Sequence, residues 1–278
     1  MCAILRISRN SFYKWKKNID LVKKKKTIAL KLKITEIWKR SRKLYGSLKI
    51  TKSLAREGLN YHPSYVSKLM KEIGIKSLTK RRYVVTTNSN HKFNISQNIL
   101  DRKFQVNELG KVWVSDITYI RCKDRWIYLT TMIDLADRKI VGWSLSEDMT
   151  AENTVYKAWI QARKNRDIVD DNFIFHSDRG SQYACEKMTK LFKYNNKITQ
   201  SMSRKGNCWD NAVAESFFKT IKCELIYRTS LNSFTQAYEK IEDYIDWYNT
   251  KRIHQSLGYL TPLEKELQLI KIKIKRAA

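Results

Sequence analysis

The sequence has few of the residues that break a chain or cross-link it. Its 278 residues include 8 glycines and 2 prolines, so glycine- and proline-rich linkers are absent. The five cysteines form no Cys-x-x-Cys pair, which argues against structural zinc and favours reduced thiols. There is no secretory signal and no apolar run of membrane length, so we expect a cytoplasmic protein without a membrane partner.

Acidic residues are scarce at the start of the chain. Lys and Arg number 55 against 27 Asp and Glu, a net charge of +28. Residues 1–100 hold 25 basic and 4 acidic residues, a net charge of +21, which leaves +7 for residues 101–278. Such a charge indicates a polyanionic partner, because neutralising phosphates releases counterions. We expect nucleic acid, bound above all by the first third; the alternative is that the charge serves solubility.

Helices are predicted throughout this basic region. Residues 5–17 indicate the end of one short helix, a turn and a second helix that Ser8 or Asn10 caps. The run Lys23–Lys26 predicts a solvated face or a linker. A longer helix ends at Gly46 at the latest, because apolar residues recur at i, i+4, i+7 and i+8. Those residues are Leu30, Ile34, Ile37 and Trp38.

Two shorter helices follow and complete a recognisable pattern. One ends at Gly58, and the next begins at Pro63 and ends before Gly74. Short helices with glycine turns are typical of a helix-turn-helix module, whose last helix enters the major groove of DNA. The alternative is a small basic bundle that binds nothing specific. The candidate DNA contacts lie near the leading end of the last helix: Ser64, Tyr65 and Lys68.

After a polar, aperiodic stretch the pattern changes from helices to strands. Three β-branched and aromatic runs predict a meander, and two later strands alternate with helices, which indicates an α/β domain. We therefore predict a basic helix-turn-helix region, a linker, a core with a mixed five-stranded sheet and flanking helices, and a C-terminal helical extension. Their respective ranges are 1–78, 79–104, 105–228 and 229–278.

Two aspartates occupy positions where acids are depleted. Asp116 lies inside the first predicted strand, and Asp178 ends the fourth. A buried carboxylate must be paired or bound to a metal, so neither residue suits an ordinary strand. The two can meet only if strands one and four are neighbours, which a meander followed by a helical crossover allows.

Glu215 supplies a third acid, on a helix that Asp210 or Asn211 is predicted to cap. It shares one stripe of this helix with Lys219 and Lys222, which suits a metal site bordered by a phosphate track. The alternative is an ordinary Glu–Lys surface pair. Three carboxylates suit Mg²⁺ or Mn²⁺, and two such ions can activate an attacking oxygen and stabilise a leaving one in phosphodiester chemistry.

Other residues near these acids have competing interpretations. Asp134 could support the site or form a salt bridge, and His176 is either a satisfied buried histidine or a ligand. The loop before the Glu215 helix is basic, with Arg204 and Lys205 as candidate DNA contacts. In the same loop, Trp209 either stacks on a base or packs under the helix.

Three long blocks resemble the second-frame (OrfB-type) transposases of the insertion sequence three family. They are "HSDRGSQY", "SMSRKGNCWDNAVAESFFKTIK" and "YNTKRIHQSLGYLTPLE", and the resemblance covers nearly the whole chain. It implies a ribonuclease-H-like integrase core with an Asp-Asp-Glu triad, which maps onto Asp116, Asp178 and Glu215. Arg179 and Gly180 would then begin a turn beside the substrate. Residues 179–214 between the last two acids are one more than is usual, an insertion that we place in the turn at residues 193–197.

The resemblance implies a transposase that cuts and joins DNA with two Mg²⁺ or Mn²⁺ ions. The partners to expect are double-stranded DNA at element ends and target, further copies of the chain on that DNA, and a protein encoded by an upstream frame. Because such a transposase binds DNA, the resemblance also implies that the protein associates with the nucleoid. The alternative is a catalytically inactive remnant that still binds DNA. A retroviral-type integrase is disfavoured, because residues 3–121 contain no cysteine for the zinc unit of that group.

Overall fold

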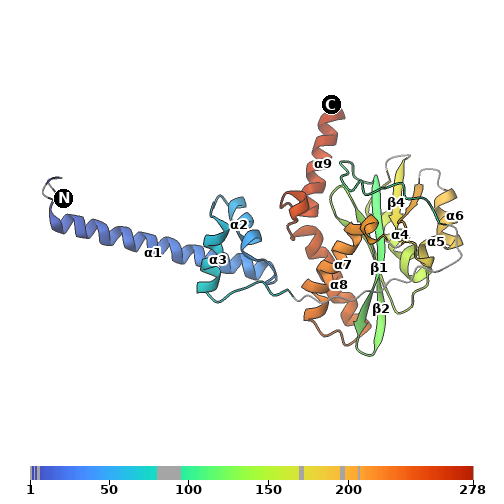
Figure 1. Ribbon diagram of the computed structural model, residues 1–278, viewed down its shortest axis with the longest axis horizontal. Coiled ribbons are helices and arrows are strands. Elements are labelled where there is room, and N and C mark those ends of the chain that lie inside the picture. Colours follow the sequence, from blue (N-terminus) through green and yellow to red (C-terminus); the bar gives the residue numbers. More distant parts are fainter. Residues whose placement is uncertain are drawn as a thin grey trace. The chain divides into compact units, whose positions relative to one another are not determined.

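The computed structural model describes residues 7–79, 95–168, 172–194, 198–205 and 207–277, together with residues 2 and 4. The chain forms two compact units, Met1–Leu78 and Thr79–Ala278 (Figure 1). Most of the predicted linker lies outside the described residues, and so does most of the turn in which we place the insertion. No helix in the described ranges is long and apolar enough to cross a membrane.

The first unit is built on one long helix rather than on several short ones. Helix α1 runs without a break over Arg9–Arg40, and the Ser8 hydroxyl accepts the Ser11 N–H as its cap. The prediction of a helix that Ser8 or Asn10 caps is therefore confirmed for Ser8. The lysine run Lys23–Lys26 is not a linker but an exposed stretch of helix. Lysine has a high helix propensity, so a helix without a stop signal continues through it.

Two short helices pack against the C-terminal half of α1. Helix α2 (Ser47–Arg56) and helix α3 (Pro63–Glu72) have the predicted bounds, and Gly58 follows α2 with a left-handed φ of 81°. The three helices enclose a small apolar core, whose most buried members are Ile34, Ile37, Ile50, Leu54, Val66 and Leu69. The N-terminal half of α1 extends beyond this core (Figure 1).

The second unit contains a mixed five-stranded sheet in the order β3-β2-β1-β4-β5. Strands β1, β2 and β3 form the predicted antiparallel meander, and β4 and β5 are parallel to β1. The strand bounds are Val112–Cys122, Arg125–Asp134, Ile140–Ser146, Phe173–Ser177 and Ile198–Met202, in order from β1 to β5. Because β1 and β4 are neighbours, the condition for Asp116 and Asp178 to meet is fulfilled.

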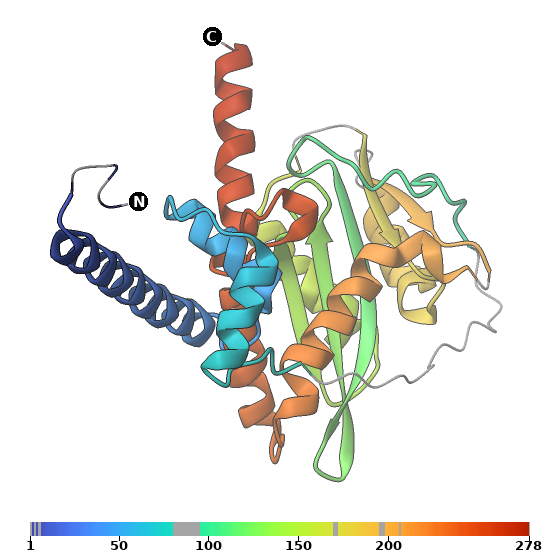
Figure 2. The same ribbon diagram turned by 60° about the vertical axis from the view of Figure 1, so that its left-hand side comes forward.

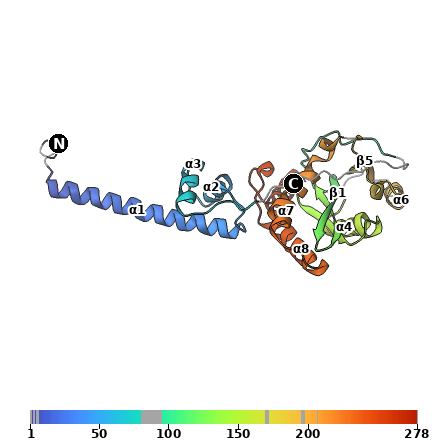
Figure 3. The ribbon, with the colours of Figure 1, turned by 60° about the horizontal axis from the view of Figure 1, so that its bottom comes forward.

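The two faces of the sheet are covered by different helices (Figure 3). A π-helix over Glu152–Tyr156 and helix α4 (Lys157–Asn165) cover the face that carries Trp113, Phe173 and Phe175, with α5 (Ser181–Ala184) and α6 (Glu186–Tyr194) beside them. Helix α7 (Ala212–Glu224), in orange in Figure 2, crosses β1 on the opposite face. Side chains alternate along a strand, so Asp116 lies on the α7 face.

Two helices at the C-terminus are joined to this core by buried ion pairs. Helix α8 covers Phe234–Thr250 and helix α9 covers Pro262–Ala277. Arg252 donates to both carboxylate oxygens of Glu224 at the end of α7, at 2.9 and 2.7 Å, and Tyr244 donates to the same carboxylate at 2.8 Å. The C-terminal region therefore holds the far end of the helix that carries Glu215.

Part of the predicted linker is bonded to the edge of the sheet. Ser201 on β5 accepts the backbone N–H groups of Ile99 and Leu100, at 2.9 and 3.2 Å. The Met202 N–H donates to the carbonyl of Gln97 at 3.3 Å. Residues 97–100 thus cover the exposed edge of β5, which would otherwise be open to pairing with another strand.

Candidate active site

Asp116 and Asp178 are placed side by side by the register of two parallel strands. Val114 on β1 pairs with His176 on β4. Asp116 and Asp178 each follow that pair by two residues, so they lie on the same face of the sheet at neighbouring positions. Both carboxyl groups are half-buried. Asp116 accepts the Ile117 N–H at 2.8 Å, and Asp178 accepts the Gly180 N–H at 2.9 Å.

Glu215 reaches this region because the start of α7 is attached to β1. The Asn211 amide donates to the carbonyl of Ser115 at 2.9 Å, one residue before Asp116. Glu215 lies one turn further along the same helix and is half-buried. Asn211 ends the short 3-10 helix Cys208–Asn211 and is the N-cap residue of α7, as one of the two alternatives predicted. Its side chain makes no capping bond, because its amide is bonded to β1 instead.

The charges of Asp178 and Glu215 both act on Asp116. Burial raises the pKa of Asp116 well above its usual value, and the charge of Asp178, followed by that of Glu215, raises it further. Lys222 opposes this shift in the pKa of Asp116. Burial also raises the pKa of Glu215, which Lys219 opposes. Carboxylates placed this way repel one another and favour a proton or a cation between them.

The donor set fits a hard divalent cation. Three carboxylates on three elements face a common region, and the buried Oδ1 of Asn211 has no protein partner, which leaves it available to a metal-bound water. Within the described residues, however, no three His, Cys, Asp or Glu side chains are close enough together to hold an ion. Binding would have to draw the carboxylates towards one another.

Residues that the sequence analysis did not single out support the aspartate pair. The Tyr183 hydroxyl and the Ser115 hydroxyl are hydrogen-bonded at 2.8 Å behind β1, and both side chains are buried. A Cβ on Gly180 would lie 3.0 Å from Oδ1 of Asp178, so a larger residue would crowd that carboxylate. Only the resemblance pointed to this turn, because hydrogen bonds between distant residues leave no periodic signal.

His176 and Asp134 have structural roles. His176 is fully buried between the hydroxyls of Ser201 and Ser203, and burial lowers its pKa to about 4, so it is a satisfied neutral histidine. Asp134 is fully buried and forms a 2.7 Å salt bridge with Arg166, as one of the two alternatives predicted. Arg166 also pairs with Asp137, and both acids lie at the end of β2.

The candidate DNA contacts of the core lie around the acids. Lys219 and Lys205 are exposed, and Lys222 is half-buried in the field of Asp116. The Nε of Arg179 donates to the carbonyl of Ser203 at 2.6 Å. Arg204 forms two side-chain hydrogen bonds to Asp210, each 2.9 Å, and half of its side chain remains exposed. The structure contains no DNA, so these assignments remain predictions.

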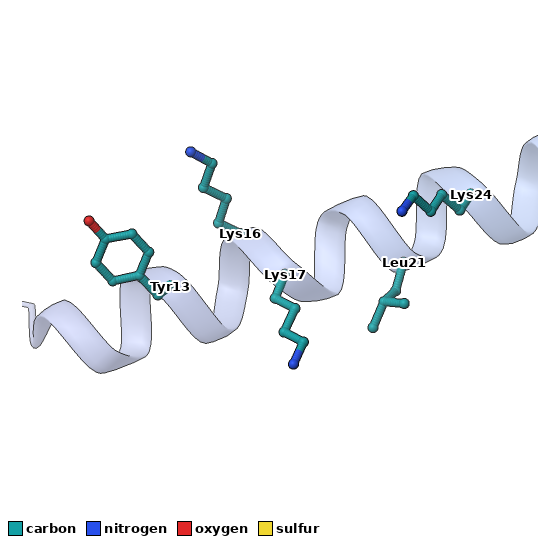
Figure 4. Close-up of a pocket in the computed structure, with 5 residues that line it drawn as sticks. All are labelled: Tyr13, Lys16, Lys17, Leu21 and Lys24. Atoms are coloured by element: carbon teal, nitrogen blue, oxygen red, sulfur yellow. The ribbon is translucent and has the colours of Figure 1, made fainter.

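The candidate contacts of the first unit lie on an open helix face. Ser64, Tyr65 and Lys68 are exposed near the start of α3, where His62 accepts the Ser64 N–H at 3.3 Å. A second basic surface lies on α1, around a hollow whose lining residues are labelled in Figure 4. These residues are Tyr13, Lys16, Lys17, Leu21 and Lys24. The sequence analysis did not single out this surface.

The order of the mixed five-stranded sheet and its flanking helices are those of a ribonuclease-H-like integrase core. Two families described as integrase core domains match residues 107–208 and 196–262, and a family described as an HTH-like domain matches residues 24–83. The fold class predicted from the sequence is confirmed, including the helix-turn-helix region before the core.

Several insertion-sequence proteins are similar to the chain over nearly its whole length. It is 34% identical to an uncharacterized 31 kDa protein of insertion element IS600 from Shigella sonnei, covering 94% of this chain and 96% of the relative. It is 34% identical to the putative transposase InsK of IS150 and 30% identical to the transposase InsF of IS3, both from Escherichia coli, covering 89% and 92% of those relatives. The chain therefore belongs to the IS3 family of insertion-sequence transposases.

Solved integrase structures show a more distant likeness. The catalytic core domain of HTLV-2 integrase, in complex with magnesium, is 15% identical, with a TM-score of 0.43, over 56% of this chain and 94% of that domain. The catalytic core domain of BIV integrase is 19% identical, with a TM-score of 0.44, over 59% of this chain. At these scores the likeness supports no conclusion about function.

Proposed function

We propose that this chain is a Mg²⁺-dependent transposase that cuts DNA at the ends of an insertion element and joins the freed 3′-hydroxyl to a target phosphate. The observation that carries the proposal is the register of β1 and β4, which sets Asp116 beside Asp178 beneath the helix of Glu215. Membership of the IS3 family supports the same reading.

Asp116, Asp178 and Glu215 would hold the metal. Two divalent ions bound there would supply an activated attacking oxygen and stabilise the leaving oxygen. The sheet would fix the positions of two of the ligands, because Asp116 lies in β1 and Asp178 directly follows β4, the strand next to it. Glu215 comes from a helix, which allows it to approach when a cation screens the repulsion among the acids.

Basic residues around the acids would position the DNA backbone. Lys219 is exposed one turn beyond Glu215, and Lys222, Arg179, Arg204 and Lys205 are the other proposed phosphate contacts. Such contacts orient a duplex without reading its sequence. In the first unit, Ser64, Tyr65 and Lys68 would read the element end from the major groove. An element has two ends, so we propose that two or more copies of the chain act together on DNA.

The test replaces each acid by its neutral isostere. Asp116→Asn, Asp178→Asn and Glu215→Gln should each reduce cleavage and strand transfer on a terminal duplex by about 100-fold or more, because the charge that holds the ion is lost. Circular dichroism should show an unchanged fold. Glu239→Gln is the matched control, since Glu239 is an exposed carboxylate on α8. Full strand transfer by any one of the three variants would remove that residue from the site.

A further inference from the structure

A large aromatic side chain next to the candidate active site is left open to solvent. Trp209 is 70% exposed, in the short 3-10 helix Cys208–Asn211 that leads into α7. Of the two predicted alternatives, packing under the helix is therefore wrong for Trp209. Exposing an indole to water is unfavourable, in proportion to its apolar area. The ring of Trp209 is therefore accessible to a partner.

The backbone on either side of Trp209 is held firmly. Asp210 is fully buried and accepts hydrogen bonds from the Arg204 backbone at 3.0 Å, from the Arg102 side chain at 2.8 Å and from the Asn98 amide at 2.9 Å. Asn211 is bonded to the Ser115 carbonyl on β1. Asp210 and Asn211 are both buried and hold the backbone, while the side chain of Trp209, just before them, points outward. Trp209 therefore projects from a backbone that is anchored on its C-terminal side.

The surroundings of Trp209 favour a nucleic acid base as its partner. Lys205 and half of the Arg204 side chain are exposed in the same loop. An aromatic ring flanked by cations matches single-stranded nucleic acid, whose bases stack on the ring while phosphates meet the charges. The acid described in this loop, Asp210, is buried and paired with Arg102 and Arg204, so its charge would not repel phosphates. A partner protein with an apolar patch would not need the cations.

The position of Trp209 relates the stacked base to the reaction. Glu215 follows Trp209 by six residues, which is on the order of 10 Å along the helix. Asn211 bonds to the residue before Asp116. The geometry points to Trp209 as a stacking platform for one unpaired base beside the scissile phosphate, which keeps the element end open at the active site. This inference rests on the proposed function for the identity of the scissile phosphate.

Chemical probing of the bound DNA tests the inference without strand cleavage. The full chain is bound, in Ca²⁺, to a duplex that carries the element's terminal repeat, with thymines placed on both sides of the terminus. Permanganate oxidises unstacked, unpaired thymines. In the complex of the wild-type chain, the thymine whose partner base stacks on Trp209 should become reactive, because it is left unpaired, whereas the base stacked on the indole is shielded. Trp209→Ala should return that thymine to the level of free duplex. Trp209→Phe, which keeps a ring, should retain the reactivity.

A second readout measures strand transfer on two substrates. Trp209→Ala should lower the rate on a paired terminus by about 5- to 150-fold, the range for loss of one stacked base. A terminus with mismatched pairs should restore the rate to within a few-fold of wild type. Trp126→Ala is the matched control, since Trp126 is 51% exposed on the β1–β2 hairpin, and should change neither readout.

Two results would overturn the stacking role. One is thymine reactivity that does not depend on Trp209. The other is an equal loss on paired and mismatched termini, which would indicate that Trp209 contacts a second copy of the chain. A wild-type chain that opens the terminus but transfers no strand would leave the stacking role standing and remove the proposed function instead.

Discussion

Asp210 shows how a single residue can hold a loop without taking part in chemistry. Hydrogen bonds from Arg204, above all, hold the pKa of Asp210 well below its usual range. A folded-state pKa below the unfolded value means that the unfolded chain binds protons more readily as the pH falls. The stabilising effect of this carboxylate is therefore present above about pH 4, the usual aspartate pKa, and is lost as the pH falls further.

Asp210→Asn tests that linkage. The variant should be less stable than wild type at pH 7, by about 1–3 kcal/mol, because two arginines lose a charged acceptor. The difference should narrow below about pH 4, where the wild-type carboxylate is protonated in the unfolded chain. Urea unfolding of both proteins between pH 7 and pH 3 measures it. A difference that stays constant over that range would show that the Asp210 charge has no part in stability.

Residue types alone identified the three acids as candidates, but not the hydrogen bonds around them. Asp116 and Asp178 stood out because charged residues are rare in strands. The roles of Ser115, Tyr183 and Asn211 could not be predicted, since each depends on contacts between residues far apart in the chain. The same reason applies to Asp210, the other of the two predicted caps: its carboxylate accepts hydrogen bonds from Arg204, Arg102 and Asn98.

At the scale of elements, the placement of α7 depends on both of its ends. Its start is bonded to β1, and its end is held by the pair between Glu224 and Arg252, in which both side chains are 10% exposed. A buried carboxylate that loses its partner is costly, so removal of Arg252 leaves Glu224 uncompensated. The C-terminal helices thus contribute to the position of Glu215.

Arg252→Ala should lower the free energy of unfolding by about 3–5 kcal/mol, the usual cost of breaking a buried pair. Lys251→Ala, one residue earlier and exposed, is the matched control and should stay within about 0.5 kcal/mol of wild type. Denaturant unfolding followed by circular dichroism measures both variants. Equal effects of the two substitutions would mean that the pair does not hold α7.

The lysines of α7 make a separate prediction about DNA. Replacing Lys219 and Lys222 by alanine should weaken binding to all DNA sequences alike and reduce the salt slope by about one to two units, near one for each phosphate contact. The control replaces Lys190 and Lys193, which are exposed on α6, on the other side of the sheet. Binding titrations at several salt concentrations give the slopes. An unchanged slope in the Lys219 and Lys222 variant would leave the core without its phosphate track.

Element types were predicted well where a local signal existed. The five strands and helices α2 and α3 follow from alternation and from glycine stops. Whether helix α1 continues through Lys23–Lys26 stayed open in the sequence, because a lysine run carries neither a stop signal nor an apolar periodicity. Whether an exposed helix continues is decided by propensity alone, which is a weak guide.

At the scale of the whole molecule, basic charge is concentrated in the unit that precedes the core. The hollow on α1 adds Lys16, Lys17 and Lys24 to that surface. Replacing these three by alanine in the full chain should reduce the salt slope of DNA binding by about two to three units. A control variant in which alanine replaces three exposed lysines of the second unit should show a smaller reduction in the salt slope of DNA binding. Equal slopes for the two triple variants would show that the first unit is not the main electrostatic contact.

The sequence analysis could state which strands must be neighbours for Asp116 and Asp178 to meet, but it could not show that they are neighbours. A meander followed by a crossover allows several strand orders, and not all of them make β1 and β4 neighbours. The boundaries proposed between linker, core and extension remain predictions. The bonds from residues 97–100 to β5 show that part of the linker range is attached to the core, which a polar, aperiodic stretch does not reveal.

The most direct test of the metal site changes the chemistry of one ligand. Asp178→Cys replaces a hard oxygen donor by a softer thiolate, which binds Mn²⁺ better than Mg²⁺. The measurement is strand transfer by the variant and by wild type on the same terminal duplex, in each metal separately. We expect the variant to be inactive in Mg²⁺ and to recover part of its activity in Mn²⁺. Full activity of Asp178→Cys in Mg²⁺ would contradict the account, because Asp178 would then not be a ligand of the metal.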